Sequence, residues 1–303
     1  MEPVQSAAPP DPRRMIAYLL VGAVMISFSG VWVKISSVSP TASAFYRAFF
    51  GGIFLLAGAV WRREIRRLSL RQNALILFCG GLFALDLICY HYSIHWVGPG
   101  LGTILPNLQV FIMALAGLFF FKEKLRPLYW CAIPLAVCGL MMVVGIRWHD
   151  LGRLYKLGIY AGLVASLCYA AFLLSLRKLQ ADDRKVSFFY VLLLVSLITA
   201  ALIGLEMLGS GESFVLPDRK ALFSLWALGL FSQCLGWILI AAALPHLRVS
   251  QSGLVLLLQP ALSFVWDVVL FGRPTGALNW AGVAVVLAAI YMGTVGGKCR
   301  SGV

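Results

Sequence analysis

Long apolar stretches alternate with short polar segments along this chain of 303 residues. About 20 residues of α-helix are needed to cross the roughly 30 Å hydrocarbon core of a bilayer. Ten runs of about that length occur, at residues 15–36, 41–61, 74–96, 99–121, 128–146, 157–176, 187–208, 221–244, 249–271 and 278–297. The pattern therefore predicts an all-α membrane protein with ten transmembrane helices.

The third and fourth runs are separated only by Val97-Gly98-Pro99-Gly100. Two abutting runs of this kind can form one long helix, but glycine and proline in this order are a strong turn signal. We therefore expect the chain to reverse its direction here.

Residues 101–145 recur, in divergent form, at residues 251–296. A shift of 150 residues pairs Leu108, Gln109, Phe121, Leu128, Trp130 and Met142 with Leu258, Gln259, Phe271, Leu278, Trp280 and Met292. A glutamine inside an apolar run and a tryptophan that opens the next run are harder to repeat by chance than leucines, so we infer a duplication. The expected organisation is a disordered cytoplasmic N-terminus (1–14), a five-helix repeat (15–146), an outer linker (147–156), a second repeat (157–297) and a cytoplasmic C-terminus (298–303).

Five spans in each repeat is an odd number, and this number fixes how the repeats are oriented. Two homologous units with an odd number of spans must lie upside down relative to each other in the membrane. Such inverted repeats place a binding site near the midplane and allow alternating access, since exchanging the conformations of the two units moves the opening from one side to the other. The geometry favours a transporter.

Composition and charge support the membrane assignment: 61% of the residues are hydrophobic and 12% are charged. The net charge of +13 does not indicate nucleic-acid binding here, because the basic residues lie between apolar runs. Seventeen Lys and Arg residues fall on the side that includes both termini and seven on the other. The positive-inside tendency therefore predicts a multi-pass protein of the inner (plasma) membrane with both termini in the cytoplasm.

The sequence lacks the motifs of several kinds of chemistry. The seven cysteines are scattered without a Cys-x-x-Cys, and we read them as buried hydrophobes rather than metal ligands or disulfides. No phosphate-binding loop is present, so the chain carries no ATP motor of its own, and we expect no cofactor and no metal. An intramembrane enzyme is disfavoured for the same kind of reason, because the hydrolase and zinc-protease motifs do not occur.

A set of short motifs resembles a known family. Pro40 followed by Arg47, the turn Lys122-Glu123-Lys124-Leu125 and the pair Gln259-Pro260 look like the EamA-type branch of the drug/metabolite transporter superfamily, and the resemblance covers nearly all the chain after Arg14. It implies efflux of amino acids or other small metabolites across a bacterial inner membrane. One departure is that Gly272-Arg273-Pro274 stands where the family usually repeats an acidic turn.

Two charged residues inside apolar runs are the leading candidates for substrate binding. Arg47 lies about two turns inside the second run, where its planar guanidinium could hold a carboxylate or phosphate or instead bond helix carbonyls. Asp86 is the deepest acid, a candidate for proton coupling or for a structural pair with Arg47. A charge at this depth costs about 2.5 to 3.5 kcal/mol, so each requires a partner or a water-filled cavity.

Uncharged polar and aromatic residues complete the candidate substrate site. Tyr90 and Ser93 follow Asp86 along one helix face, and His91 and His95 form a second stripe that lacks a third metal ligand. The full substrate-binding set is Trp32, Arg47, Asp86, Tyr90, His91, Asn107, Gln109, Tyr169, Gln233, Trp237 and Gln259. Pro106 and Pro260 interrupt helices beside three of these amides, which is typical of transporter sites, although amides also join helices to one another.

The leading hypothesis is a secondary transporter for a small polar or amphipathic metabolite, present as a monomer or homodimer in the lipid bilayer. The alternative is a membrane-embedded binding or sensor subunit that moves nothing. The sequence leaves the cargo, the direction and the coupling ion open.

Overall fold

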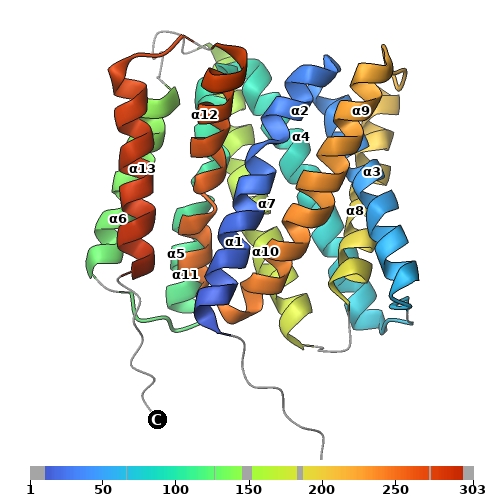
Figure 1. The fold of residues 1–303 in the computed structure, drawn as a ribbon, viewed down its shortest axis with the longest axis horizontal. Helices are drawn as coiled ribbons and strands as arrows, with labels where there is room; N and C mark the ends of the chain where they lie inside the picture. Colours follow the sequence, from blue (N-terminus) through green and yellow to red (C-terminus); the bar gives the residue numbers. More distant parts are fainter. Residues whose placement is uncertain are drawn as a thin grey trace, which may run out of the picture.

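The computed structural model describes residues 11–65, 67–125, 127–144, 152–182, 187–272 and 274–295. Over these ranges the chain forms a bundle of upright helices and no strand (Figure 1). Seven helical segments are long and apolar enough to cross a membrane, and shorter apolar helices at Ile104–Phe119, Pro127–Val143 and Ala277–Gly293 occupy the fourth, fifth and tenth expected runs. The expected all-α membrane architecture is confirmed.

The helices follow the apolar runs closely, and several runs are divided into two or more helical pieces. The first half consists of α1 (Pro12–Ser27), α2 (Ser29–Ser36), α3 (Pro40–Trp61), α4 (Leu70–Asn107), α5 (Gln109–Phe119) and α6 (Pro127–Val144). The second half consists of α7 (Arg153–Asp182), α8 (Phe188–Ser210), α9 (Arg219–Ala227), the π-helix η1 (Leu228–Gly236), α10 (Trp237–Ala243), the 3-10 turn η2 (Leu244–His246), α11 (Val249–Val255), α12 (Leu258–Phe271) and α13 (Ala277–Val295).

Two expected boundaries shift. Residues 12–14 belong to α1 rather than to a disordered N-terminus, and residues 153–156 belong to α7 rather than to the linker. Residues 1–10 and 298–303 lie outside the described residues.

Local sequence explains where helices begin and end. The side chains of Ser39 and Asp218 accept hydrogen bonds from backbone amides of the first turns of α3 and α9, at 3.1 and 2.6 Å. Ser69 and Gln72 form a reciprocal capping box at the start of α4. Helix α12 ends at Gly272, whose φ of 63° is a left-handed conformation that favours glycine.

Helix α4 folds back on itself. It is continuous by its backbone hydrogen bonds from Leu70 to Asn107, but a Cβ placed on Gly162 of α7 would lie 2.7 Å from Ser93 Oγ and 2.6 Å from Leu105 Cβ. In a straight helix, positions this far apart in sequence would be about 18 Å from each other. The reversal expected at residues 97–100 is therefore confirmed, although no loop interrupts the helix there.

Helices at equivalent places in the two repeats pack against each other in opposite directions. Gly52 of α3 contacts Leu197 of α8, whereas Gly58, further along α3, contacts Phe189, which lies earlier in α8. This antiparallel pairing of equivalent helices is what an inverted repeat requires.

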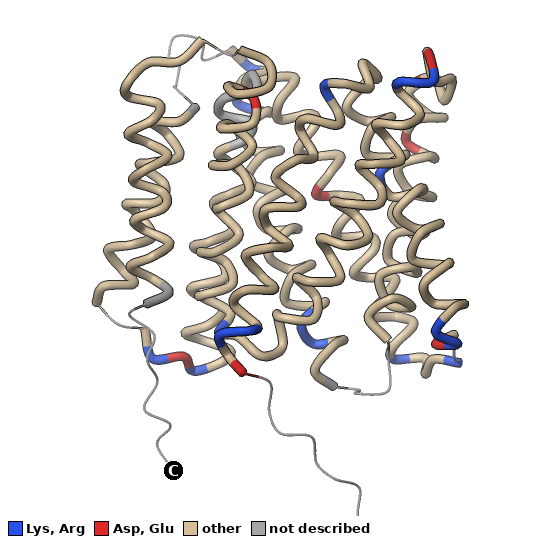
Figure 2. The backbone as a smooth tube through the Cα atoms, in the orientation of Figure 1, with Lys and Arg blue, Asp and Glu red and all other residues tan. Residues whose placement is uncertain are grey.

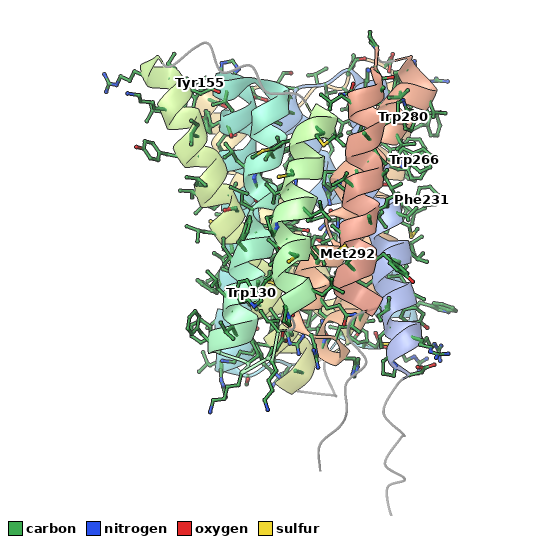
Figure 3. The ribbon with its side chains drawn as sticks, turned by 90° about the vertical axis from the view of Figure 1, so that its left-hand side faces the viewer. Trp130, Tyr155, Phe231, Trp266, Trp280 and Met292 are labelled. Atoms are coloured by element: carbon green, nitrogen blue, oxygen red, sulfur yellow. The ribbon has the colours of Figure 1, made fainter. Side chains whose placement is uncertain are left out.

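The pair α6 and α13 shows the same inversion. Gly139 and Gly282 approach so closely that a Cβ on Gly282 would lie 2.6 Å from the carbonyl oxygen of Gly139. Figure 3 shows Trp130 and Trp280, which the 150-residue shift makes equivalent, near opposite ends of these adjacent helices. The second repeat is thus turned over relative to the first.

The start of the first described helix and the end of the last one lie on the same side of the bundle. Helix α1 begins and α13 ends at what we call the termini end, and α2 ends and α3 begins at the opposite, far end (Figure 1). Charged positions gather at these two ends and are sparse between them (Figure 2). A charged residue in the middle of the bundle is therefore exceptional and needs an explanation.

Candidate functional site

A cavity of about 1070 Å³ lies between the two repeats. Its walls come from α1 to α4, α6, α7, η1, α10 and α12. It extends from the middle of the bundle to the far end, where its wall includes Pro40 at the start of α3 and Phe271 at the end of α12. Eight of the eleven candidate residues line it: Arg47, Asp86, Tyr90, His91, Asn107, Tyr169, Trp237 and Gln259.

Arg47 enters the cavity from α3, about two turns after the Ser39 cap. Its Nε donates a hydrogen bond of 3.0 Å to Oε1 of Gln233, and its guanidinium carbon lies 6.0 Å from the centre of the Phe83 ring. Gln233 in turn donates to Ser196 Oγ at 3.0 Å. This bond engages Nε rather than the terminal nitrogens of the guanidinium, and Arg47 lines the cavity.

Asp86 of α4 is 7% exposed and faces the same cavity. It interacts electrostatically with Arg47, but within the described part of the chain the two form no ion pair. The positive and the negative group are therefore both available to a ligand that carries both charges.

Aromatic rings form the floor of the cavity. Trp237 is 2% exposed and makes edge contacts with Phe83 and Phe172, with ring centres 5.6 and 5.0 Å apart. Tyr169 lies 6.4 Å from the same indole. Trp237 is thus packed in the hydrophobic core and also lines the cavity.

Two buried nitrogens of the cavity wall, Nε1 of Trp237 and Nε2 of Gln259, have no hydrogen-bond partner among the residues that the structure describes. The Gln259 amide does lie beside the Tyr169 hydroxyl, but not in a geometry that makes a hydrogen bond. A buried donor without a partner costs about 1 to 3 kcal/mol, so these two nitrogens favour an acceptor, such as a ligand or a water, in the cavity.

Three candidate residues lie outside the cavity wall. Gln109 is fully buried and donates to the carbonyl of Gly253 at 3.3 Å, so it joins α5 to α11. Gln233 accepts the hydrogen bond from Arg47 Nε without lining the cavity itself, and Trp32 stacks on Phe231 with ring centres 6.3 Å apart. Polar residues of these types look the same in a sequence whether they face a cavity or a neighbouring helix.

Of the polar residues in the two stripes expected on α4, some line the cavity and others do not. Tyr90 and His91 line the cavity, with ring centres 5.7 Å apart. Ser93 is fully buried against Gly162, and His95 is exposed and absent from the cavity wall. Among the described residues no group of three His, Cys, Asp or Glu side chains could hold a metal ion.

Sequence reasoning missed several residues of the cavity wall. Ser27 and Ser43 line it, and each hydroxyl donates to a carbonyl of its own helix at 2.6 Å. Because this bond is common for serines in apolar helices, nothing in the sequence distinguishes these two residues from serines that only pack. At the far end, Asp267 of the wall pairs with Lys34 at 2.9 Å, and this ion pair joins α12 to α2.

Comparison with known proteins gives consistent results. The EamA-like transporter family matches residues 13–145 and 156–295. The pseudopaline exporter CntI of Pseudomonas aeruginosa (strain UCBPP-PA14) is 24% identical over 281 residues, which cover 90% of this chain and 94% of the relative. A probable amino-acid metabolite efflux pump of Salmonella typhimurium (strain LT2) is 21% identical over 207 residues, which cover 66% and 69%.

A solved structure supports the fold. A protein of known crystal structure superposes with a TM-score of 0.81 at 18% sequence identity, over 95% of this chain and 99% of the other. The family model covers both halves, and the fold agrees over nearly the whole length. The chain belongs to the EamA-like transporter family.

Proposed function

We propose that the protein is a secondary transporter that exports a small metabolite by alternating access. The observation that carries this proposal is the cavity of about 1070 Å³, which lies between two inverted repeats and has Arg47 and Asp86 in its wall. Ligand sites usually measure about 300 to 1,000 Å³, so the cavity has room for a metabolite together with water.

The polar groups suit a substrate with both an acid and an amine, such as an amino acid or a related compound. Arg47 would bind the carboxylate through its terminal nitrogens, because guanidinium and carboxylate match in geometry. Asp86, together with the faces of Tyr90 and Phe83, would hold the amine. The unpaired donors of Trp237 and Gln259 would complete the binding of the carboxylate.

The names of the relatives support export rather than import. One is a pseudopaline exporter and another a probable amino-acid metabolite efflux pump. If the termini face the cytoplasm, as the distribution of basic residues indicates, the cavity opens toward the outside. The conformation would then be the one that follows release of an exported substrate.

The test is uptake of labelled amino acids and related metabolites into inside-out membrane vesicles that contain the protein. We expect accumulation, and we expect Arg47→Ala to abolish it and Arg47→Lys to weaken it by about tenfold or more, because lysine cannot bind a carboxylate in the bidentate mode. Arg13→Ala, which removes an exposed arginine of α1, serves as the matched control and should leave uptake unchanged.

Binding without accumulation for every compound tested would instead identify a sensor subunit. Equal uptake by the Arg47→Ala protein and the control would exclude Arg47 from the site.

A further inference from the structure

A carboxylate joins the two repeats at the termini end of the bundle. Glu123 lies in the turn between α5 and α6 and reaches across to the start of α11. Its Oε1 accepts from the Val249 amide at 2.6 Å, and its Oε2 accepts from the Ser250 amide at 3.2 Å and the Ser250 hydroxyl at 2.6 Å. One side chain therefore joins the two repeats through three charge-assisted hydrogen bonds.

Two more side chains bind the same segment, residues 244–250, which runs from η2 into the first turn of α11. Tyr129 of α6 donates to the carbonyl of Ser250 at 2.7 Å. Arg177 of α7 donates to the carbonyls of Leu244 and Leu247 and lies over the ring of Phe121 at 5.1 Å. We call Glu123, Tyr129, Arg177 and residues 244–250 the termini-end latch.

The latch and the cavity occupy opposite parts of the bundle. None of the described residues within 108–142 or 238–258 lines the cavity, and these ranges include the latch residues of α5 to α6 and of α10 to α11. The cavity therefore reaches the far end but not the segments that the latch joins.

The sequence carries no counterpart of this latch in the inverted position. The 150-residue shift that aligns the repeats places Arg273 opposite Glu123, Pro99 opposite Val249 and Gly100 opposite Ser250. Arginine has no acceptor, proline has no amide hydrogen and glycine has no hydroxyl. All three parts of the carboxylate latch are thus missing from the other repeat.

We infer that the Glu123 latch makes the two access states unequal and sets the resting state as the one closed at the termini end and open at the far end. The inference rests on the alternating access proposed above. Loading from the termini end then requires the three bonds of Glu123 to break, and no equivalent set of bonds opposes the return.

Removing the carboxylate should shift the resting state. We propose to attach spin labels to a cysteine-free background and to measure distances in lipid nanodiscs. One pair of labels, at Lys124 and Lys178, reports on the termini end; the other, at Lys220 and Thr275, reports on the far end. All four positions are exposed. In Glu123→Ala we expect the molecules open at the termini end to increase about tenfold or more, with a matching rise in molecules closed at the far end.

A milder variant protects the test against loss of folding. A Cβ on Gly117 would lie 2.6 Å from Glu123 Oε2, so Gly117→Ala should displace the carboxylate without removing it and shift the distances in the same direction. The matched control is Asp11→Ala, which removes an acid at the same end whose side chain accepts a hydrogen bond from the Arg13 amide at 3.0 Å, at the start of its own helix α1. It should give the wild-type distances.

Wild-type distances in both folded latch variants would overturn the inference, and Gly117→Ala decides alone if Glu123→Ala does not fold. If the termini end opens while the far end does not close, the latch stands and alternating access fails. If vesicles accumulate substrate but neither variant changes the distances, the proposed function stands and the latch inference fails.

Discussion

Gln233 illustrates how a residue outside the cavity can act on what binds inside it. Its carbonyl oxygen fixes Arg47 Nε, and its amide nitrogen is fixed by Ser196. The side chain is 2% exposed and packs against Gly51, so it has little freedom to move. We therefore treat Gln233 as a positioning residue for Arg47 rather than as a substrate ligand.

Gln233→Leu should weaken transport by raising KM about tenfold, because Arg47 would lose one hydrogen bond to a charged group, worth about 1.5 to 3 kcal/mol. Concentration-dependent uptake in vesicles measures this. Gln109→Leu is the matched control, since Gln109 is an equally buried amide that joins helices away from the cavity. An unchanged KM in folded Gln233→Leu would contradict the positioning role.

Asp86 is the proposed proton-coupling residue. Asp86→Asn should lose uphill accumulation driven by a pH gradient, because the amide cannot carry a proton across. Exchange of external for internal labelled substrate should continue at saturating concentration but with a raised KM, because the amine of the substrate loses its charged partner. Glu206→Gln provides the control: this acid accepts a hydrogen bond from Tyr92 at 3.3 Å and does not line the cavity. Undiminished uphill transport by Asp86→Asn would exclude this residue from coupling.

The charged cavity residues could be found from sequence because a charge in an apolar run is costly and therefore informative. Amides and indoles carry no such penalty, so the sequence could not separate Gln259, which lines the cavity, from Gln109, which joins helices. Their roles depend on the neighbouring helix, and a single sequence does not show which helices are neighbours.

Among the helices, the α6 and α13 pair depends on glycine at its crossing point. Gly282→Val should lower the thermal stability of the purified protein by about 1 to 3 kcal/mol, since the new side chain would meet the Gly139 carbonyl at 2.6 Å and the Val143 amide at 2.7 Å. A thermal melt in detergent measures the change.

Gly81→Ala is the matched control in α4, because nothing lies within 4 Å of the position its Cβ would take. Alanine there should be neutral or stabilising by up to about 1 kcal/mol. Equal melting temperatures for Gly282→Val and Gly81→Ala would show that the close approach does not limit stability.

Apolar runs predicted where helices lie but not how their hydrogen bonds are arranged. Helical hydrogen bonding is interrupted at Leu108, between α4 and α5, and at Leu256 and Leu257, between α11 and α12. The sequence shows no polar segment at either place, because the residues at the interruptions are leucines. They do fall near equivalent places, since adding 150 to Leu108 gives Leu258. The prolines 106 and 260 were the only local signal, and they marked the right regions.

For the complete bundle, the repeat and its odd span number predicted the inversion that the antiparallel pairs display. The preference for one access state could not be predicted in the same way. It depends on which residue Glu123 reaches, and that contact joins segments 126 residues apart.

Orientation in the membrane is open to a direct test. Single cysteines at Lys124 and at Thr275 should react with a membrane-impermeant reagent from the cytoplasmic and the outer side respectively, because the basic residues place the termini end in the cytoplasm. The comparison uses intact cells and inside-out vesicles. The reverse pattern would mean that the cavity opens to the cytoplasm.

The π-helix η1 has a consequence for insertions and deletions. Each of its hydrogen bonds spans one residue more than in an α-helix. Loss of one residue between Leu228 and Gly236 would let ordinary α-helical bonding resume, because the wide turn accommodates one additional residue, and the helices on either side would keep their directions. Gln233 lies inside the stretch and would turn relative to Trp237, which begins the next helix. A single codon lost from this short stretch would thus disturb the support of the arginine while the tryptophan of the cavity keeps its place.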